Sequence, residues 1–462
     1  MRSREESFKF QVQSSKFKID LPSIIHFHIS TFPHFHISTF PHFHISTFSH
    51  FHISTFSHFH ISMIPFSPPH IDEKIINEVV ETLRSGWITT GPRTKAFEKK
   101  LAEYSGVSNV LCVNSASSGL ELMLHWFGVG PGDEVIVPAY TYTASAAVII
   151  HCGATPVMVD VDENFLIRPD LVRKAITERT KAVIPVDIAG FPCDYDALNA
   201  IVNEPAVKQL FHANSPEQQM LGRPLILSDA AHSLGAWYKG QRTGALADLT
   251  VFSFHAVKNL TTAEGGAICL HLPEPFDNGQ LYKQLCIYSL HGQSKDALAK
   301  TQIGNWRYDV LEAGYKCNMA DVVAAIGLIE IERYDSIIVK RRREIFDAYA
   351  AAFSKDEHFQ IPIYRTGDKE SSYHVFALRI KGITEEQRDA MMQRIFAQEV
   401  SVNVHFIPLP MLTAYKKRGY KIEDYPTTYD NYAREISLPV YYDLTDEQVQ
   451  QVIDAVFKAI NE

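Results

Sequence analysis

One lysine occupies a position that suits covalent chemistry. Lys258 follows an apolar run, Leu249–Phe254, that predicts a strand, and small residues then lead to a second apolar run, Ala267–Leu270. The lysine therefore lies on the connection between two strands that we expect to be buried. An amine at the edge of an apolar interior is poorly solvated, so its pKa falls and it can condense with a carbonyl group to form a Schiff base. A surface lysine in an ordinary loop is the alternative.

A carboxylate stands in a similar place upstream. Asp229 ends the predicted strand Leu225–Asp229, and the next two residues, Ala230 and Ala231, allow close approach of another group. A carboxylate at a strand end usually caps the following helix, which is one interpretation. Near a Schiff-base lysine, the same carboxylate would pair with a protonated pyridine nitrogen, and that pairing makes pyridoxal phosphate (PLP) an electron sink.

A loop of small hydroxyl residues provides a candidate phosphate site. Ser115, Ser117 and Ser118 lie between a predicted strand that starts at Asn109 and a helical pattern over residues 121–126. Backbone N–H groups, the helix dipole and serine hydroxyls converge on an anion in that geometry. The alternative is that Ser117 only caps the helix. The glycine spacing of Walker and Rossmann loops is absent from this stretch.

Three separated motifs together resemble a known family. Asp229–His232, Ser253–Asn259 and Glu264–Gly266 occur in the order found in the DegT/DnrJ/EryC1/StrS family of PLP-dependent sugar aminotransferases. The resemblance runs from about Pro65 to the C-terminus. It implies PLP as the cofactor, with Lys258 and Asp229 as the catalytic residues.

The resemblance also implies roles for other residues around the cofactor and the substrate. The predicted cofactor contacts are Ser117, Ser118 and Ser253 at the phosphate, Tyr142 stacked on the pyridine ring, His232, and Lys316 reaching the phosphate of a neighbouring subunit. The predicted substrate contacts are Thr89 and His405. Three alternatives stay open: a core position for Tyr142, an ordinary loop over residues 86–93, and a structural role for His405.

Two of these motifs depart from the family pattern. Residues 116–118 read Ala-Ser-Ser where family members have Gly-Thr-Ala, which keeps a hydroxyl in place. Residues 314–319 read Gly-Tyr-Lys-Cys-Asn-Met where the family usually has Gly-Tyr-Asn-Tyr-Arg-Met, so Lys316 replaces an amide. A lysine suits a phosphate at least as well as an amide does.

The family's activity implies the partners. They are L-glutamate as amino donor, a nucleotide-linked keto sugar as acceptor, most commonly 4-keto-6-deoxy, and a second copy of the chain that completes each site in a homodimer. The products would serve surface polysaccharides or glycosylated compounds. A minority of family members are dehydratases with histidine in place of the lysine, so Lys258 favours transamination. A non-catalytic regulator of the same fold is the alternative from another class, and the presence of Lys258, Asp229 and Ser253 together argues against it.

The elements that position these residues alternate between strands and helices. Helices are predicted over residues 72–85, 94–104 and 322–333. Strands are predicted at 109–113, 133–138, 155–162, 181–188, 225–229, 249–254 and 267–270. Such alternation predicts an α/β fold with a mostly parallel sheet wrapped by helices and a site at the carboxyl ends of the strands. The resemblance implies the seven-stranded sheet of fold-type I aminotransferases.

A smaller α+β domain is predicted to follow. We expect a PLP-binding large domain over residues 63–333 and a small domain over 334–462. The small domain would contain a long helix with Arg341, Arg342 and Arg343 on a solvated face, strands at 373–380 and 402–406, and helices at 384–399 and 446–460. The polar stretch 203–223 is interpreted as an insertion without an assigned function.

Composition narrows the class of protein. The chain has 462 residues, 46% of them hydrophobic, and a net charge of −9, which gives no reason to expect nucleic-acid binding. Its six cysteines lack CxxC spacing and are interpreted as reduced thiols of a cytoplasmic protein. Because no run of 18 apolar residues occurs, no membrane span is expected.

The first 62 residues differ from the rest. Residues 26–62 repeat an eight-residue unit rich in histidine and phenylalanine, and this tract holds ten of the 21 histidines. A metal-binding or solenoid repeat is one interpretation, and a signal peptide is disfavoured because histidine and serine interrupt the apolar residues. We favour a third interpretation, in which the repeat is an upstream nucleotide tract that is translated because the start was placed too early. Met63 would then be the natural first residue. The repeat would lie outside the fold and would hold no metal.

Overall fold

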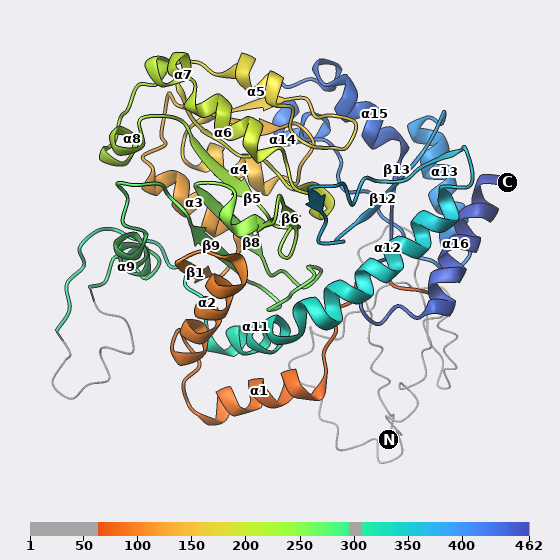
Figure 1. Ribbon diagram of the computed structural model, residues 1–462, viewed down its shortest axis with the longest axis horizontal. Coiled ribbons are helices and arrows are strands. Elements are labelled where there is room, and N and C mark those ends of the chain that lie inside the picture. Colours follow the sequence, from red (N-terminus) through yellow and green to blue (C-terminus); the bar gives the residue numbers. More distant parts are fainter. Residues whose placement is uncertain (1–62, 295–306, 462) are drawn as a thin grey trace, which may run out of the picture. The chain divides into compact units, whose positions relative to one another are not determined.

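The computed structural model describes residues 63–294 and 307–461 (Figure 1). The predictions for residues 1–62, including the histidine repeat, lie outside the described residues. The remaining chain contains a seven-stranded sheet in the order β1-β9-β8-β5-β4-β2-β3. Its strands are β1 (Asn109–Val113), β2 (Glu134–Pro138), β3 (Thr155–Val159), β4 (Thr180–Val183), β5 (Leu225–Asp229), β8 (Leu249–Ser253) and β9 (Gly266–Leu270).

The direction of these strands confirms the predicted sheet. β3, β2, β4, β5 and β8 run parallel to one another. β9 is antiparallel to both β8 and β1. β2, β5 and β9 are buried at every position, as expected for strands that are covered on both faces. The parallel strands bring Asp229 and Ser253, at the ends of β5 and β8, to the same edge.

Helices cover the sheet. They are α1 (Glu73–Arg84), α2 (Pro92–Ser105), α3 (Ala116–Trp126), α4 (Ala144–His151), α5 (Pro169–Ala175), α6 (Tyr195–Asn203), α7 (Pro205–Leu210), α8 (Pro216–Leu221), α9 (Asn278–Tyr288) and α11 (Asp321–Arg333). α11 packs against both α1 and α2 (Figure 1). The sequence sets their ends: the Asp72 carboxylate accepts from the Ile75 N–H at the start of α1, and Gly106 ends α2 with a φ of 72°.

The C-terminal part forms a second, antiparallel sheet with its own helices. β12 (Phe376–Ile380) lies between β10 (Phe359–Gln360) and β13 (Glu435–Leu438). The helices here are α12 (Lys340–Phe353), α13 (Glu385–Phe396), α14 (Thr413–Lys416), α15 (Pro426–Arg434) and α16 (Asp446–Asn461), and α12 and α16 lie side by side (Figure 1).

The two sheets belong to one compact unit. A third small sheet connects them, because β11 (Lys369–Glu370) pairs with β6 (Trp237–Tyr238), which pairs with β7 (Gln241–Arg242). The predicted boundary at residue 333 falls inside a continuous helical run, in which a π-helical segment (Tyr334–Val339) joins α11 to α12. The division into a large and a small domain stays a prediction.

The predicted strand at residues 402–406 is wrong. Only Asn403 makes a backbone bridge there, to Ser437 of β13. The next N–H that could continue a ladder, that of His405, donates to the side chain of Glu435 instead, at 3.1 Å. The strand β13, whose residues are all buried, was not predicted.

The predicted solvated arginine face is wrong for Arg342. Its side chain is 3% exposed, and Nη1 donates to the backbone oxygens of Tyr373 and His374 at 3.1 and 3.2 Å. Burial lowers the pKa of Arg342 to about 10. This arginine therefore fixes the backbone just before β12.

The polar stretch 203–223 contains the short helices α7 and α8. Gln218 of α8 is fully buried, and its side-chain amide donates to the backbone oxygens of Phe127 and Gly128 after α3. The stretch therefore packs onto the end of α3.

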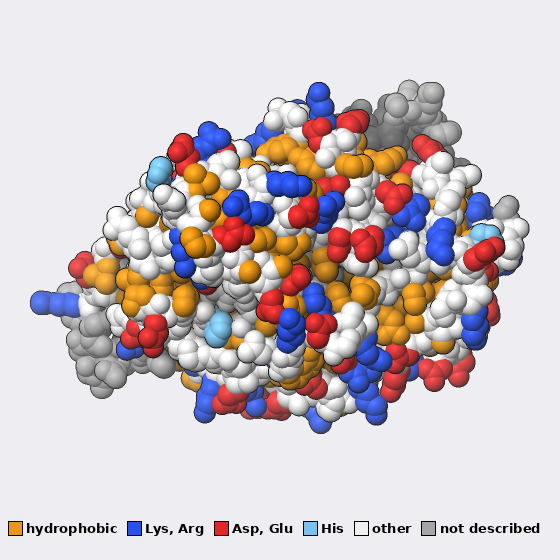
Figure 2. Space-filling view, turned by 45° about the horizontal axis from the view of Figure 1, so that its top comes forward, with side chains coloured by type: hydrophobic (Ala, Val, Ile, Leu, Met, Phe, Trp, Pro, Cys, Tyr) orange, Lys and Arg blue, Asp and Glu red, His pale blue; other side chains and the backbone are white. Residues whose placement is uncertain are grey.

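Three general features accompany this fold. In residues 63–294 and 307–461, no helix is long and apolar enough to cross a membrane, and no cluster of three metal-ligating side chains occurs. All six cysteines lie in these ranges and none forms a disulfide. Acidic and basic side chains are interspersed over the face shown in Figure 2.

Candidate active site

A cavity of about 470 Å³ opens at the carboxyl ends of β5 and β8, beside the first turn of α3. Seven of the predicted site residues line it: Ser117, Tyr142, Asp229, His232, Ser253, Lys258 and His405. These residues come from five separate segments of the chain, so their convergence depends on the fold.

Lys258 is half-buried in the turn that follows β8. Its backbone N–H donates to the oxygen of His255 at 2.8 Å, which directs the chain back toward β9. Burial lowers the pKa of Lys258 to about 8, although the negative charge of Asp229 opposes the shift. A substantial fraction of the amine is therefore neutral and nucleophilic near physiological pH, and an ordinary surface loop is not its environment.

Asp229 faces the cavity from the end of β5. Its Oδ2 accepts from Ser145 Oγ at 2.7 Å, and its Oδ1 accepts from the Ala231 N–H at 3.2 Å. Burial raises the pKa of the carboxyl, and these hydrogen bonds with the charge of Lys258 act in the opposite direction. Because residues 231–235 form turns, the interpretation of Asp229 as a helix cap is wrong.

The first turn of α3 provides free N–H groups at the cavity. Ser115, and not Ser117, is the N-cap, and its Oγ accepts from the Ser118 N–H at 3.1 Å. The hydroxyls of Ser115 and Ser118 also bond each other at 2.9 Å. Ser115 and Ser117 line the cavity, and Ser118 does not. A helix N-terminus with an available serine is a suitable anion site.

Gly266 explains why this turn can approach β9. A Cβ at Gly266 would lie 2.6 Å from the Ala116 nitrogen and 2.7 Å from the Ser115 carbon, both of them rigid backbone atoms. Gly266→Ala is therefore expected to lower the free energy of unfolding by about 1–3 kcal/mol, since α3 must shift. Urea unfolding of the cofactor-free protein measures this. Gly130→Ala is the control, because nothing lies within 4 Å of the added Cβ, and its effect is expected to stay within about 0.5 kcal/mol. Equal effects of both substitutions would contradict the assigned close approach.

Tyr142 lies at the mouth of the cavity. Its side chain is 58% exposed, so the alternative of a core tyrosine is wrong. Its ring centroid is 5.5 Å from that of Phe406. The ring is thus available to cover a flat ligand.

Three histidines form another wall. His232 Nδ1 accepts from the Ala189 N–H at 3.2 Å, and its ring lies 4.4 Å from that of His374. Burial lowers the pKa of both rings well below the usual value. Burial, with the charge of Lys258 adding to it, lowers the pKa of His405 to about 4. All three are therefore neutral imidazoles near pH 7.

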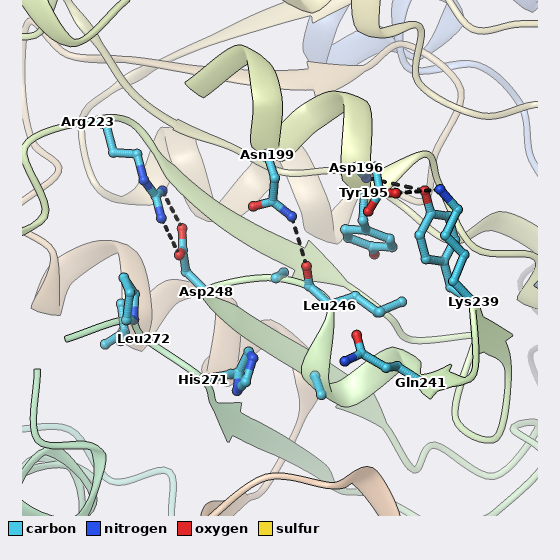
Figure 3. Close-up of a pocket in the computed structure, with 14 residues that line it drawn as sticks. Tyr195, Asp196, Asn199, Arg223, Lys239, Gln241, Leu246, Asp248, His271 and Leu272 are labelled. Atoms are coloured by element: carbon cyan, nitrogen blue, oxygen red, sulfur yellow. Dashed lines mark hydrogen bonds and ion pairs between the residues drawn. The ribbon is translucent and has the colours of Figure 1, made fainter. Parts of the chain in front are cut away.

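A second hollow, of about 370 Å³, lies apart from these residues. Its charges are paired internally: Arg223 donates twice to the Asp248 carboxylate at 2.7 Å, and Lys239 to Asp196 at 2.5 Å (Figure 3). The amide of Asn199 donates to the Leu246 oxygen at 3.2 Å (Figure 3). These groups hold neighbouring segments together, so the first cavity is the candidate active site.

The sequence model of the DegT/DnrJ/EryC1/StrS aminotransferase family matches residues 69–215 and 219–457. The chain belongs to this family. The prediction from the motifs is thereby confirmed, and so are the predictions of a fold-type I α/β architecture and of an aminotransferase.

Similar proteins agree with the family. The structure of Spr1654 from Streptococcus pneumoniae, assigned as a sugar aminotransferase and solved in PMP form, matches with a TM-score of 0.83 and 47% identity over 86% of this chain and 99% of that one. The same protein was also solved in PLP form. The spore coat polysaccharide biosynthesis protein SpsC of Bacillus subtilis is 38% identical over 400 residues, 85% of this chain and 96% of its own. Helicobacter pylori PseC, an aminotransferase involved in the biosynthesis of pseudoaminic acid, matches with a TM-score of 0.74 and 25% identity, over 86% of this chain and 99% of that one.

Besides Ser118, two residues predicted for the site of this aminotransferase do not line the cavity of their own chain. The backbone oxygen of Thr89 accepts from the Asp321 N–H at 3.2 Å. Lys316 Nζ donates to the side-chain oxygen of Asn318. The contact of Lys316 with the cofactor phosphate of a neighbouring subunit stays a prediction.

Other residues at this site were not predicted, and four of them make contacts that shape it. Ser145 holds Asp229, and His374, Phe66 and Ser67 line the cavity. The ring of Phe66 stacks on His405 at 5.3 Å and 23°, and Ser67 Oγ donates to the Val257 oxygen at 3.3 Å. Because Ile64 pairs with Val400, the N-terminal arm of residues 64–67 is attached to the fold just before it reaches the cavity.

The amine of Lys258 should lose its proton at a lower pH than an ordinary lysine does. We expect the rate of its modification by a small aldehyde, trapped with borohydride, to rise with pH and to reach half its maximum near pH 8, because only the neutral amine reacts. Asp229→Asn should move this midpoint to lower pH, since the carboxylate charge raises the Lys258 pKa. Peptide mass mapping of the cofactor-free protein measures both. A midpoint near the ordinary lysine value of about 10.4 would contradict the burial effect.

Proposed function

We propose that this aminotransferase uses PLP to move an amino group from L-glutamate to the keto group of a nucleotide-linked sugar. The observation that carries the proposal is the presence of Lys258 and Asp229 in one cavity, next to the free first turn of α3. The similarity to Spr1654, which was solved in PLP and PMP forms, supports the choice of cofactor.

The residues of the cavity fit each part of PLP. Lys258 suits its aldehyde, Asp229 suits its pyridine nitrogen, and the turn of α3 with Ser117 suits its phosphate. The flat ring has an exposed aromatic face to stack on, at Tyr142, and a small side chain beside it, at Ala231. When bound, PLP supplies the electron sink that transamination requires.

The protein's own groups then have definite tasks. Lys258 Nζ, with its lowered pKa, takes a proton from the donor's Cα and returns it at another carbon. Asp229 keeps the pyridine nitrogen protonated, and Ser145 holds its Oδ2 in position. The neutral histidines 232, 374 and 405 and the ring of Phe66 limit the access of water.

The acceptor is proposed to be a 4-keto-6-deoxy sugar, the commoner case in the family. The product would be an amino sugar for surface polysaccharide or for a glycosylated compound. The assigned activity of Spr1654 and the polysaccharide pathway of SpsC support a sugar acceptor.

The test is the visible absorption spectrum of the protein that begins at Met63, before and after L-glutamate. A yellow band that bleaches with glutamate is expected, and a keto sugar should restore it, as ping-pong kinetics require. A protein that stays colourless after PLP is supplied would refute the proposal and favour the regulatory alternative. Loss of the sugar's hydroxyl without nitrogen transfer would favour the dehydratase alternative.

We also propose a homodimer with shared sites. Lys316 lies outside the cavity of its own chain, and the large apolar side chains of Ile88, Tyr308, Val310 and Leu311 are each more than half exposed. Light scattering should give twice the chain mass. Mixing Lys258→Ala with Lys316→Ala protein and allowing subunits to exchange should restore activity above that of either variant alone. A monomer with full activity would contradict the proposal.

The fold is proposed to begin at Met63. Ile64 already pairs with Val400, which supports a complete structure from this residue onward. Equal melting temperature and activity of the full chain and of the protein from Met63 are expected. Lower stability of the shorter protein would give residues 1–62 a structural role.

A further inference from the structure

A chain of hydrogen bonds leads from a buried carboxyl to the cavity. Glu435 and Ser437, both on β13, are fully buried, and His405 lines the cavity. Ser437 Oγ lies 2.5 Å from Glu435 Oε1, and His405 Nδ1 lies 2.9 Å from Ser437 Oγ. The other carboxyl oxygen, Oε2, accepts from the backbone N–H of His405 at 3.1 Å.

These contacts determine where each proton can be. Since Oε2 already faces an N–H donor, a proton on the carboxyl must be on Oε1, which faces Ser437. Ser437 has one hydroxyl proton and can give it to only one of its two partners. The neutral imidazole of His405 likewise has one N–H.

Two arrangements satisfy these constraints. If Glu435 is a carboxylate, Ser437 donates to Oε1 and accepts from His405 Nδ1–H, so Nε2 has a lone pair. If Glu435 is a carboxylic acid, it donates to Ser437, Ser437 donates to Nδ1, and the proton is on Nε2. Because Ser437 occupies Nδ1, Nε2 is the nitrogen that His405 can offer to a bound molecule.

We propose that Glu435 is a positioning residue that sets, through Ser437, which ring nitrogen of His405 carries the proton. In the acid form of Glu435, His405 offers an N–H donor to the cavity, which suits the carbonyl oxygen of a keto sugar. In the carboxylate form it offers only an acceptor. The role toward a sugar rests on the proposed function, but the coupling of the three residues does not.

The surroundings of Glu435 favour the acid form near neutral pH. Burial raises its pKa to about 8, although the hydrogen bonds from Ser437 and from the His405 N–H, and then the charges of Arg388 and Arg379, oppose the shift. Arg388 donates to the backbone oxygen of Glu435 at 2.9 Å, and Arg379 on β12 donates to Asn431 at 2.6 Å. Burial, and then the charge of Glu435, raise the pKa of the nearby Tyr140 hydroxyl. On the cavity side, the charge of Lys258 helps to lower the pKa of His405, which lies near the neutral His232.

The test is nitrogen NMR of the PLP-loaded protein with labelled histidine, in which the His405 signal is identified by its loss in His405→Gln. We expect the wild type to change from the Nε2–H to the Nδ1–H form as the pH rises through about 8. Glu435→Gln should stay in the Nε2–H form throughout. Its amide oxygen must face the His405 N–H, so its amide nitrogen faces Ser437 and imitates the acid. Ser437→Ala should remove the pH-dependent change.

His232 is the internal control, because the Ala189 N–H fixes its Nδ1 as an acceptor. Its form should not change in either variant. The same His405 form at every pH in the wild type, or the same titration in the wild type and Glu435→Gln, would overturn the proposal. The wild-type titration requires no substitution, so a variant that fails to fold does not prevent the test.

Kinetic measurements distinguish a failure of this proposal from a failure of the proposed function. The kcat/KM for the keto sugar should fall above pH 8 in the wild type by about tenfold per pH unit, and this fall should be absent in Glu435→Gln. The half-reaction with L-glutamate should have the same pH profile in both proteins. If the tautomer of His405 follows the protonation of Glu435 but the protein does not aminate sugars, only the proposed function is refuted. If the protein aminates sugars but the tautomer of His405 does not depend on Glu435, only this inference is refuted.

Discussion

Lys258→Ala is expected to reduce kcat for transamination by about 10⁴-fold or more. The substitution removes the group that we propose to hold the cofactor and to move the proton, and proton transfer alone contributes up to about 10⁴-fold. Steady-state assays with L-glutamate and a keto sugar measure the loss. After borohydride reduction, the wild type should carry the cofactor on the peptide that contains Lys258, and the variant should carry none.

Two substitutions control for this result. Lys239→Ala removes an exposed lysine that pairs with Asp196 at the second hollow, and it should leave kcat unchanged. Lys258→Arg keeps a positive charge but no nucleophilic amine, and it should be as inactive as the alanine variant. Transamination by Lys258→Ala at a rate near that of the wild type would rule out the assigned chemistry.

Asp229→Asn should lower kcat by about 10²–10³-fold, the usual cost of removing one electrostatic contact to the reacting group. The amide keeps the size of the side chain but cannot hold a proton on the pyridine nitrogen. Because cofactor attachment depends on Lys258, the variant should still bind PLP. Absorption and single-turnover kinetics with L-glutamate therefore separate binding from chemistry.

Ser145→Ala perturbs the same carboxylate more mildly than Asp229→Asn does. It removes the 2.7 Å hydrogen bond to Asp229 Oδ2 and leaves the carboxylate in place. Loss of one such bond to a charged group costs about 1.5–3 kcal/mol, so its effect should be smaller than that of Asp229→Asn. Equal losses in both variants would mean that orientation, and not charge, is what Asp229 contributes.

The sheet and the positions of Asp229 and Lys258 could be predicted because local patterns determine them. Buried parallel strands are continuous apolar runs, and a polar residue that ends such a run, as Asp229 ends β5, must emerge at the carboxyl edge. Lys258 was predictable for the same reason, since it lies on the connection between β8 and β9.

The residues that were missed depend on contacts between distant segments. His374 belongs to a run that resembles any buried strand, and only the docking of residues 371–375 against Ala189 and Asn259 brings it to the cavity. Ser145 is one small residue in an alanine-rich helix. Arg342 was misinterpreted because a run of three arginines usually faces water, whereas here the middle one binds two backbone oxygens.

The N-terminal arm also affects how the protein should be prepared for experiments. Phe66, which stacks on His405 at the cavity, lies only three residues after Met63. An affinity tag fused ahead of Met63 would therefore be tethered within a few residues of the cavity, where it is expected to compete with large sugar substrates. No residue of α16 lines the cavity, so a tag placed after this helix is the better choice for kinetics and for ligand soaking.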